Sequence, residues 1–162
     1  MAIDARLQQL LDEDDIDYEI LHHRRDFRAR LTANDTHTPP REFAKCVVVH
    51  VDDRFALALL PATHYLAPAR MARSIGASQV RLASESEMRE LMPGYDVGAA
   101  PPFPSLCGLP VYASPLLARD ERITFNAGTH RDALRMAWAD YERLAKPEVV
   151  HLSHHEDEPP PE

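Results

Sequence analysis

The segment 43–60 restricts the fold most, because two apolar runs stand on either side of a short acidic break. The first run, Phe43–Val51, carries the consecutive valines Val47, Val48 and Val49 at its centre. Asp52 and Asp53 separate it from the second run, 55–60. Runs of branched and aromatic apolar residues that are joined by a two-residue polar turn predict a β-hairpin. We therefore expect two adjacent buried strands here.

The rest of the chain alternates helix and strand patterns, which predicts one α/β domain. With 162 residues, 44% of them hydrophobic, the chain suffices for one core that buries roughly 70% of the extended surface. Pro68 and Gly76 bound one expected helix, and Ser84 with Glu87 forms a capping-box pattern for a second. The expected helices are 3–11, 68–75, 85–91 and from about Ala139; the expected strands are 18–20, 43–51, 55–60, 80–82, 109–113, 123–126 and a short one from Leu134.

Three segments lack such a pattern. Residues 22–41 are polar and basic, which predicts a long loop or a loosely helical excursion. Residues 96–108 read DVGAAPPFPSLCG, and this density of glycine and proline predicts a shaped loop. Residues 151–162 predict a solvated tail. We accordingly expect a folded domain at 1–147 and a disordered, acidic and proline-rich tail at 148–162.

The net charge of −8 limits the possible ligands. Four acidic residues near the C-terminus, Glu156, Asp157, Glu158 and Glu162, supply half of it, so the remainder is mildly acidic. Proteins that grip long nucleic acid neutralise phosphates with basic residues. The composition therefore argues against DNA and extended duplexes but is compatible with one nucleotide or an RNA end. No apolar run approaches a membrane span, and charges interrupt residues 1–14, which predicts a cytoplasmic protein without a membrane partner.

Neither a metal nor an organic cofactor is expected. Cys46 and Cys107 lie far apart without a second ligand at metal spacing, so we expect two buried thiols. Nine histidines occur, but no HExxH or compact His/Asp cluster accompanies them in the core. The absence of GxxxxGK[ST] and GxGxxG sequences argues against Walker-type NTPases and Rossmann dehydrogenases.

Lys45 is the first candidate functional residue. It is one of two lysines, beside sixteen arginines, and it lies within the most apolar strand. Side chains alternate along a strand, so Lys45 shares a face with Val47 and Val49 while Cys46 points the other way. An ammonium beside a core face needs an anion or a cleft. The alternative is a lysine at the exposed beginning of the strand, with its stem extended to water.

Two loops supply the other candidates. Gly98, Pro101, Pro102 and Phe103 form a rigid segment that could cradle a ligand or an oxyanion, although an ordinary crossover connection has the same composition. Gly128 follows a strand and stands near His130, a pattern that also fits a common turn. His22, at the start of the long polar segment, is a further candidate for substrate binding.

The order and spacing of several segments resemble the YbaK/prolyl-tRNA-synthetase-associated family. These segments are FAKCVVV, LLPATHYL, ARSIGASQVRLAS, YDVGAAPPF, LPVYAS, ITFNAG and ADYERL. The resemblance covers roughly residues 2–147. It implies a mixed, partly barrel-like sheet flanked by helices, and hydrolysis of the ester between a mischarged amino acid and tRNA. The implied ligand is the 3′ end of aminoacyl-tRNA, which also suggests association with the translation machinery.

The resemblance also implies roles for single residues. Lys45 matches the lysine that holds the terminal adenosine or its phosphate, and Gly98 with Pro102 matches the loop around the aminoacyl group. Asp140 stands where relatives carry an acidic residue after the last strand. Lys45, Gly98 and Asp140 are thus the expected catalytic set. The expected substrate-binding set is Pro101, Pro102, Phe103, Gly128, His130 and His22.

The chain departs from these relatives within the loop. Pro101 and Pro104 replace a small polar residue and a glycine, and Ala133 stands where some relatives have serine. A stiffer loop predicts a preference for small amino acids. The alternatives are a non-catalytic module that binds a nucleotide or small metabolite in the same pocket, and an interaction protein that uses Arg24, Arg25, Arg28 and Arg30.

Overall fold

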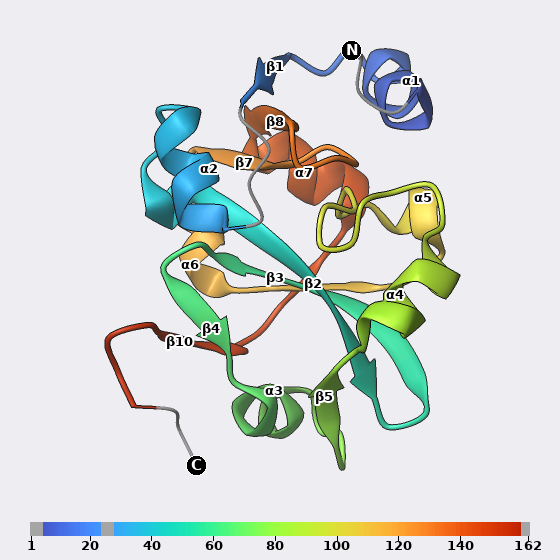
Figure 1. The fold of residues 1–162 in the computed structure, drawn as a ribbon, viewed down its shortest axis with the longest axis vertical. Coiled ribbons are helices and arrows are strands. Elements are labelled where there is room, and N and C mark those ends of the chain that lie inside the picture. The colour runs from blue at the N-terminus through green and yellow to red at the C-terminus, as the bar shows by residue number, and fades with distance from the viewer. Residues whose placement is uncertain (1–4, 24–27, 160–162) are drawn as a thin grey trace.

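A computed structural model describes residues 5–23 and 28–159 of the chain. One mixed sheet forms its centre (Figure 1). Its strands are β1 (Tyr18–His22), β2 (Phe43–Val51), β3 (Arg54–Pro61), β5 (Val80–Leu82), β6 (Val111–Ala113), β7 (Arg122–Asn126), β8 (Asp132–Ala137) and β9 (Glu148–Val149). They follow the order β1-β8-β7-β2-β3-β6-β9, and β5 pairs with β2 outside this path. A separate antiparallel ribbon joins β4 (His64–Leu66) to β10 (Ser153–His155).

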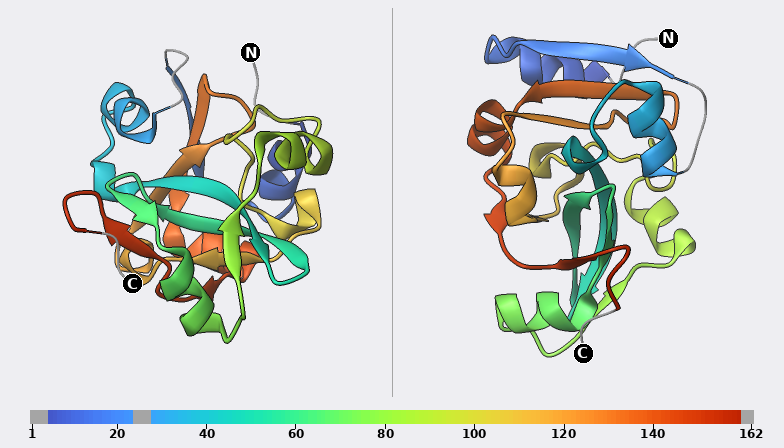
Figure 2. Two further views of the ribbon diagram at one scale, coloured as in Figure 1. Left: turned by 60° about the horizontal axis from the view of Figure 1, so that its bottom comes forward. Right: turned by 90° about the vertical axis from the view of Figure 1, so that its left-hand side faces the viewer.

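Short helices surround the sheet, with α1 and β1 at one end of the molecule and α3 at the other (Figures 1 and 2). They are α1 (Ala5–Glu13), α2 (Ala29–Asp35), the 3-10 helix η1 (Pro40–Glu42), α3 (Pro68–Ile75), α4 (Glu85–Leu91), α5 (Pro104–Cys107), α6 (Pro115–Ala118) and α7 (Trp138–Ala145). The single α/β domain with a mixed sheet is therefore as expected. In the described ranges, no helix has the length and apolarity needed to cross a bilayer.

The β2–β3 hairpin confirms the strongest sequence expectation. It pairs from Ala44 opposite Pro61 to Val51 opposite Arg54, with Asp52 and Asp53 at the turn. One face of the hairpin packs into the larger core, where Leu57 and Leu59 are fully buried. The other face packs into a second core around Met71. Because both faces are covered, every residue of this hairpin needs an apolar or well-partnered side chain.

Local signals placed α3 and α4 correctly, whereas α5 lies in the segment expected to be a loop, and β4 and α6 were not expected. Pro68 begins α3, and Gly76 ends it in a left-handed conformation with φ +72°. The capping box of α4 is complete, since Ser84 and Glu87 each bond the other's main-chain amide. The ambiguous segment after 130 divides into β8 and α7 at Trp138, one residue before the expected boundary. The long polar segment contains α2 and η1, which makes the helical alternative for that segment correct.

The expected disordered tail is wrong for residues 148–155. β9 pairs with β6, and β10 pairs with β4. Leu152 is 1% exposed and packs in the second core beside Val150. Full burial of a leucine side chain contributes about 1.5–3 kcal/mol, which anchors the segment. The acidic and proline-rich surroundings obscured this short apolar alternation in the sequence.

Candidate functional site

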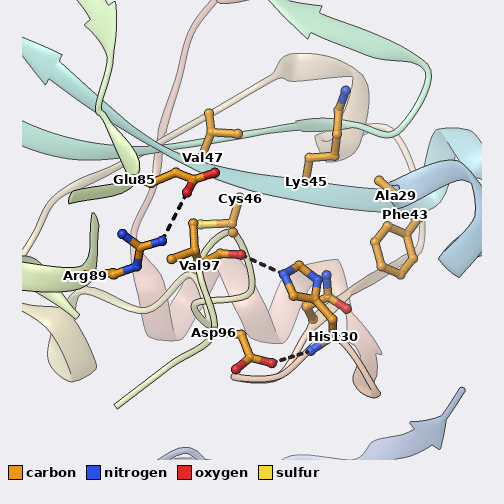
Figure 3. Close-up of a pocket in the computed structure, with 12 residues that line it drawn as sticks. Ala29, Phe43, Lys45, Cys46, Val47, Glu85, Arg89, Asp96, Val97 and His130 are labelled. Carbon is orange, nitrogen blue, oxygen red and sulfur yellow. Dashed lines mark hydrogen bonds and ion pairs between the residues drawn. The ribbon is translucent and has the colours of Figure 1, made fainter. Parts of the chain in front are cut away.

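The main cavity opens where β2 separates from β7. These strands pair only at Phe43 and Ala44, and β2 meets β5 only from Val49 onward. A cavity of about 530 Å³ lies at the intervening edge of β2. Its lining comes from that edge, from the loop after α4, from the end of β7 and from α4 itself (Figure 3). The cavity thus depends on two strands diverging, and it joins segments from across the chain.

Lys45 borders this cavity, but its ammonium points away from Val97 and His130 (Figure 3). The ammonium donates a hydrogen bond to the carbonyl of His64 and lies 5.0 Å from the centre of the Tyr65 ring. No described carboxylate forms an ion pair with it. Burial lowers the pKa of Lys45 to about 8. This cation is therefore held by a neutral carbonyl and an aromatic ring, both of which an anionic ligand could replace.

The lowered pKa predicts a gain of stability on the basic side. Lys45 titrates near 8 in the folded chain and at an ordinary value of 10.5 when unfolded. Between these values the unfolded chain binds more protons, so the free energy of unfolding should rise with pH. Below pH 8 the cost of burying the charge is fully present. Denaturation should show Lys45→Met more stable than wild type at pH 7.5, with the difference narrowing by pH 9.5. A stability difference between the two proteins that stays constant from pH 7.5 to pH 9.5 would contradict the lowered pKa of Lys45.

Gly98 and His130 form the opposite side of the cavity. His130 is 4% exposed, and its Nε2 donates to the carbonyl of Val97 at 2.6 Å. Its main-chain amide donates to the carboxylate of Asp96 at 3.1 Å. Gly98 has φ +83°, a conformation that favours glycine, and a Cβ there would lie 3.7 Å from Cε1 of His130. His130 consequently fixes the path of the 96–98 segment.

Gly128 supports the same loop through its main chain. Its carbonyl accepts from the amide of Asp96 at 2.9 Å, and its amide donates to the carbonyl of Ala99 at 2.8 Å. By contrast, the amides of Val97 and Gly98 donate to no group of the described chain. Two unpaired N–H groups at a cavity are a potential anion-binding pair.

Five of the six expected binding residues, all except His130, lie outside the cavity lining. Phe103 is 1% exposed, and its ring centre lies 5.3 Å from that of Tyr141 and 5.7 Å from that of Phe125. Pro101 and Pro102 are buried, and the Pro102 carbonyl accepts from the Tyr141 hydroxyl at 2.7 Å. The expectation that these residues form the pocket wall is therefore wrong. A large aromatic side chain gains more from the core than from a polar cavity.

Asp140 and His22 also lie elsewhere. Asp140 borders a separate shallow hollow with Tyr18 and Arg135, so its expected catalytic role finds no support in the geometry. His22 contacts the carboxylate of Asp132 at 2.6 Å, and that carboxylate accepts from the Thr129 hydroxyl at 2.7 Å. His22 thus supports the turn before His130 without lining the cavity.

The sequence did not indicate several cavity residues. Glu85 and Arg89 of α4 stand at the rim, 3.1 Å apart. Their i,i+4 spacing is common on solvent-exposed helices and carries little information. Cys46 lines the cavity at the edge of β2, but its thiol belongs to the larger core. Burial raises the pKa of the Cys46 thiol, which excludes it as a ready nucleophile.

Other sequence features contribute no further site. Among residues 5–23 and 28–159, no group of three or more His, Cys, Asp or Glu could hold a metal ion. Cys46 and Cys107 are free thiols. Arg24 and Arg25 of the basic segment lie outside the described residues, while Arg30 pairs with Glu156.

The fold is a small α/β domain with a cavity at the side of its sheet. The chain belongs to the aminoacyl-tRNA editing domain family, whose model matches residues 28–144. It is 32% identical over 152 residues to the multifunctional Ser/Thr-tRNA deacylase ProXp-y of Escherichia coli strain K12, with 91% of this chain and 90% of the relative covered.

Further comparisons give a shorter sequence match and a shared fold. Over 73 residues the chain is 34% identical to proline--tRNA ligase of Halalkalibacterium halodurans, covering 45% of this chain and 13% of the ligase. A solved structure described as a candidate trans-editing enzyme for prolyl tRNA synthetase has a TM-score of 0.79 and 21% identity, covering 94% of this chain and 99% of the other. Hypothetical protein APE2540 has a TM-score of 0.80 and 19% identity, covering 92% and 99%. At these identities the solved structures support the fold alone.

Proposed function

We propose that this protein is a free-standing aminoacyl-tRNA deacylase, which hydrolyses the ester between a small, wrongly attached amino acid and the 3′ end of tRNA. The observation that carries the proposal is the cavity that Lys45 borders and that the unpaired amides of Val97 and Gly98 adjoin. Its volume of about 530 Å³ lies within the usual range for small-molecule sites. Membership of the editing-domain family supplies the reaction class.

The chemistry needs no side-chain nucleophile. An aminoacyl ester is already activated, so a positioned water and stabilisation of the tetrahedral oxyanion can suffice. In this proposal the amides of Val97 and Gly98 donate to the oxyanion, and His130 holds them in place through the Val97 carbonyl. The water oxygen bonds to the ester carbonyl carbon, and a neighbouring ribose hydroxyl or a second water relays the proton of the attacking water. The bond from that carbon to the ribose oxygen then breaks, and the departing oxygen receives the relayed proton, which releases the free amino acid and the RNA end. Lys45 binds the phosphate of the terminal nucleotide after releasing the His64 carbonyl.

The charge distribution limits the contact to the RNA end. A chain with a net charge of −8 repels the body of a tRNA, so attraction must come from local cations. Lys45 borders the cavity and can supply this attraction, whereas Arg89, which also lines the cavity, is paired with Glu85. The substrate is a component of translation, and we therefore place the protein in the cytoplasm, in association with the translation machinery.

The amino acid is proposed to be serine or threonine, because the relative from Escherichia coli is a Ser/Thr-tRNA deacylase. We expect a panel of aminoacyl-tRNAs, assayed against buffer alone, to show deacylation of seryl- and threonyl-tRNA at least 10-fold faster than of phenylalanyl-tRNA. Faster deacylation of the bulky substrate would contradict the size selection. Tight binding without turnover would instead identify a binding module, the alternative that the proline-rich loop raised.

A further inference from the structure

Within the described residues, part of the β2 edge near the cavity has no strand partner. Amide and carbonyl groups of successive residues in a strand point to alternate edges. The Phe43 carbonyl accepts from Ala62 on the β3 side, whereas the Val48 carbonyl accepts from Ala83 on the β5 side. The groups of Cys46 therefore point to the same edge as those of Val48, away from β3. Cys46 and its neighbours Lys45 and Val47 line the cavity (Figure 3).

No strand pairs with Cys46 at that edge in the described chain. The pairing with β7 ends at Ala44, and the pairing with β5 begins at Val49. Cys46 is only 8% exposed. A buried main-chain N–H and C=O without partners are rare in folded proteins, because each lost hydrogen bond costs about 1–3 kcal/mol. The arrangement is thus suited to a ligand that presents an acceptor beside a donor.

We propose that the main chain of Cys46 recognises the Watson–Crick edge of the terminal adenine of the RNA substrate. The Cys46 amide donates to adenine N1, and its carbonyl accepts from the adenine amino group. This inference rests on the proposed function, since it assigns the base of the same substrate. Cytosine offers the same acceptor and donor on a smaller ring, whereas guanine and uracil present them reversed.

The positions of neighbouring groups favour the base over the aminoacyl group as the partner of Cys46. A terminal aminoacyl nucleotide has three arms on one ribose: the phosphate, the base and the ester. Lys45 is the cation for the phosphate, and the amides of Val97 and Gly98 are the donors for the ester oxygen. Cys46 lies between these groups at the cavity (Figure 3). Val47 and Val97 add apolar surface for the faces of a planar ring.

The first test varies the terminal nucleotide. Seryl-RNA substrates ending in A, C, G or U are charged by an aminoacylating ribozyme, and kcat/KM for deacylation is measured. We expect kcat/KM to be highest for the substrate ending in A, within about 10-fold of that for C, and about 100-fold lower for G and U. With G or U, donor would face donor and acceptor would face acceptor, so the buried groups of Cys46 would stay unpaired. A pocket that selected shape alone would group A with G. A kcat/KM for the substrate ending in G that lies within twofold of the value for the substrate ending in A would overturn the inference.

Atom-specific analogues and a protein variant sharpen this test. Terminal 1-deazaadenine or purine should reduce kcat/KM by about 10-fold, since each removes one hydrogen bond, while 7-deazaadenine should match adenine. Cys46→Ala, which keeps the main chain, should keep the ratio between A and G. A lower kcat/KM with 7-deazaadenine but not with the other analogues would contradict recognition by the main chain. So would a Cys46→Ala protein that no longer prefers A over G.

A binding measurement separates this inference from the proposed function. Non-hydrolysable seryl-amide analogues of adenosine and guanosine are compared by calorimetry. Preference for the adenosine analogue without deacylation of any substrate would refute the deacylase function but support the base recognition. Deacylation of all four RNA ends at equal rates would refute only the base recognition. Equal affinity for the two analogues, or no binding of either, would also overturn the base recognition.

Discussion

Replacement of Lys45 with alanine should reduce kcat/KM for deacylation by about 100-fold and leave the melting temperature nearly unchanged. A hydrogen bond between a charged group and its partner contributes about 1.5–3 kcal/mol, and this loss falls on the nucleotide phosphate. The fold should lose little, since the ammonium contacts only the His64 carbonyl and the Tyr65 ring. Deacylation of seryl-tRNA, measured beside thermal unfolding of both proteins, checks this expectation.

Two further variants control for the charge and the shape of Lys45. Lys45→Arg should restore little activity, because a planar guanidinium is larger than an ammonium and binds differently. Lys146 is the other lysine of the chain; it is exposed and ends α7 with φ +48°. Lys146→Asn removes the same charge and suits that backbone conformation, so it should keep full activity. Near-normal deacylation by Lys45→Ala with an unchanged melting temperature would remove Lys45 from the site.

Gly98→Ala should lower kcat/KM by about 100-fold, because it disturbs the segment that carries the proposed oxyanion donors. A Cβ at φ +83° costs about 1–2 kcal/mol in a left-handed conformation. Space is not the problem, since the added Cβ would meet His130 at an ordinary 3.7 Å. The backbone should relax instead and move the amides of Val97 and Gly98. A misplacement of about 1 Å can cost 100-fold in rate.

Gly76→Ala is the matched control for this loop. Gly76 has φ +72°, and an added Cβ would meet no atom within 4 Å. It ends α3, at the opposite end of the molecule from α1 (Figure 1). Both variants should lose similar free energy of unfolding, and only Gly98→Ala should lose deacylation. Equal loss of activity in the two would point to destabilisation and not to the proposed donors.

The fold was largely predictable because its main signals are local. The Val47–Val49 run, the Asp52–Asp53 turn, the capping box of Ser84 and the terminal Gly76 each depend on neighbours within a few residues. The cavity was not predictable in this way, because it arises where β2 leaves β7, and these strands are some 80 residues apart in sequence. The order of several short segments pointed to the family, but no spacing in the sequence shows which edge of a strand lacks a partner.

Single site residues were harder to place than elements. Lys45, Gly98 and His130 line one cavity, but the Lys45 ammonium points away from Val97, and the roles of these residues stay predictions. Phe103 could not be placed from sequence, because a glycine- and proline-rich loop gives no indication of which side chain faces the core. Asp140 was misplaced for a related reason: α7 turns it toward β1 and β8. The C-terminal strands were missed because two or three residues of pairing leave almost no pattern.

The most direct test of the central claim is a multiple-turnover assay of wild-type protein at catalytic concentration with excess seryl-tRNA. The proposed deacylase should release many equivalents of serine per protein molecule, well above spontaneous hydrolysis, and Lys45→Ala should remove most of that release. Release of no more than one equivalent, or protection of the ester from spontaneous hydrolysis, would show that the cavity binds the RNA end without catalysing deacylation.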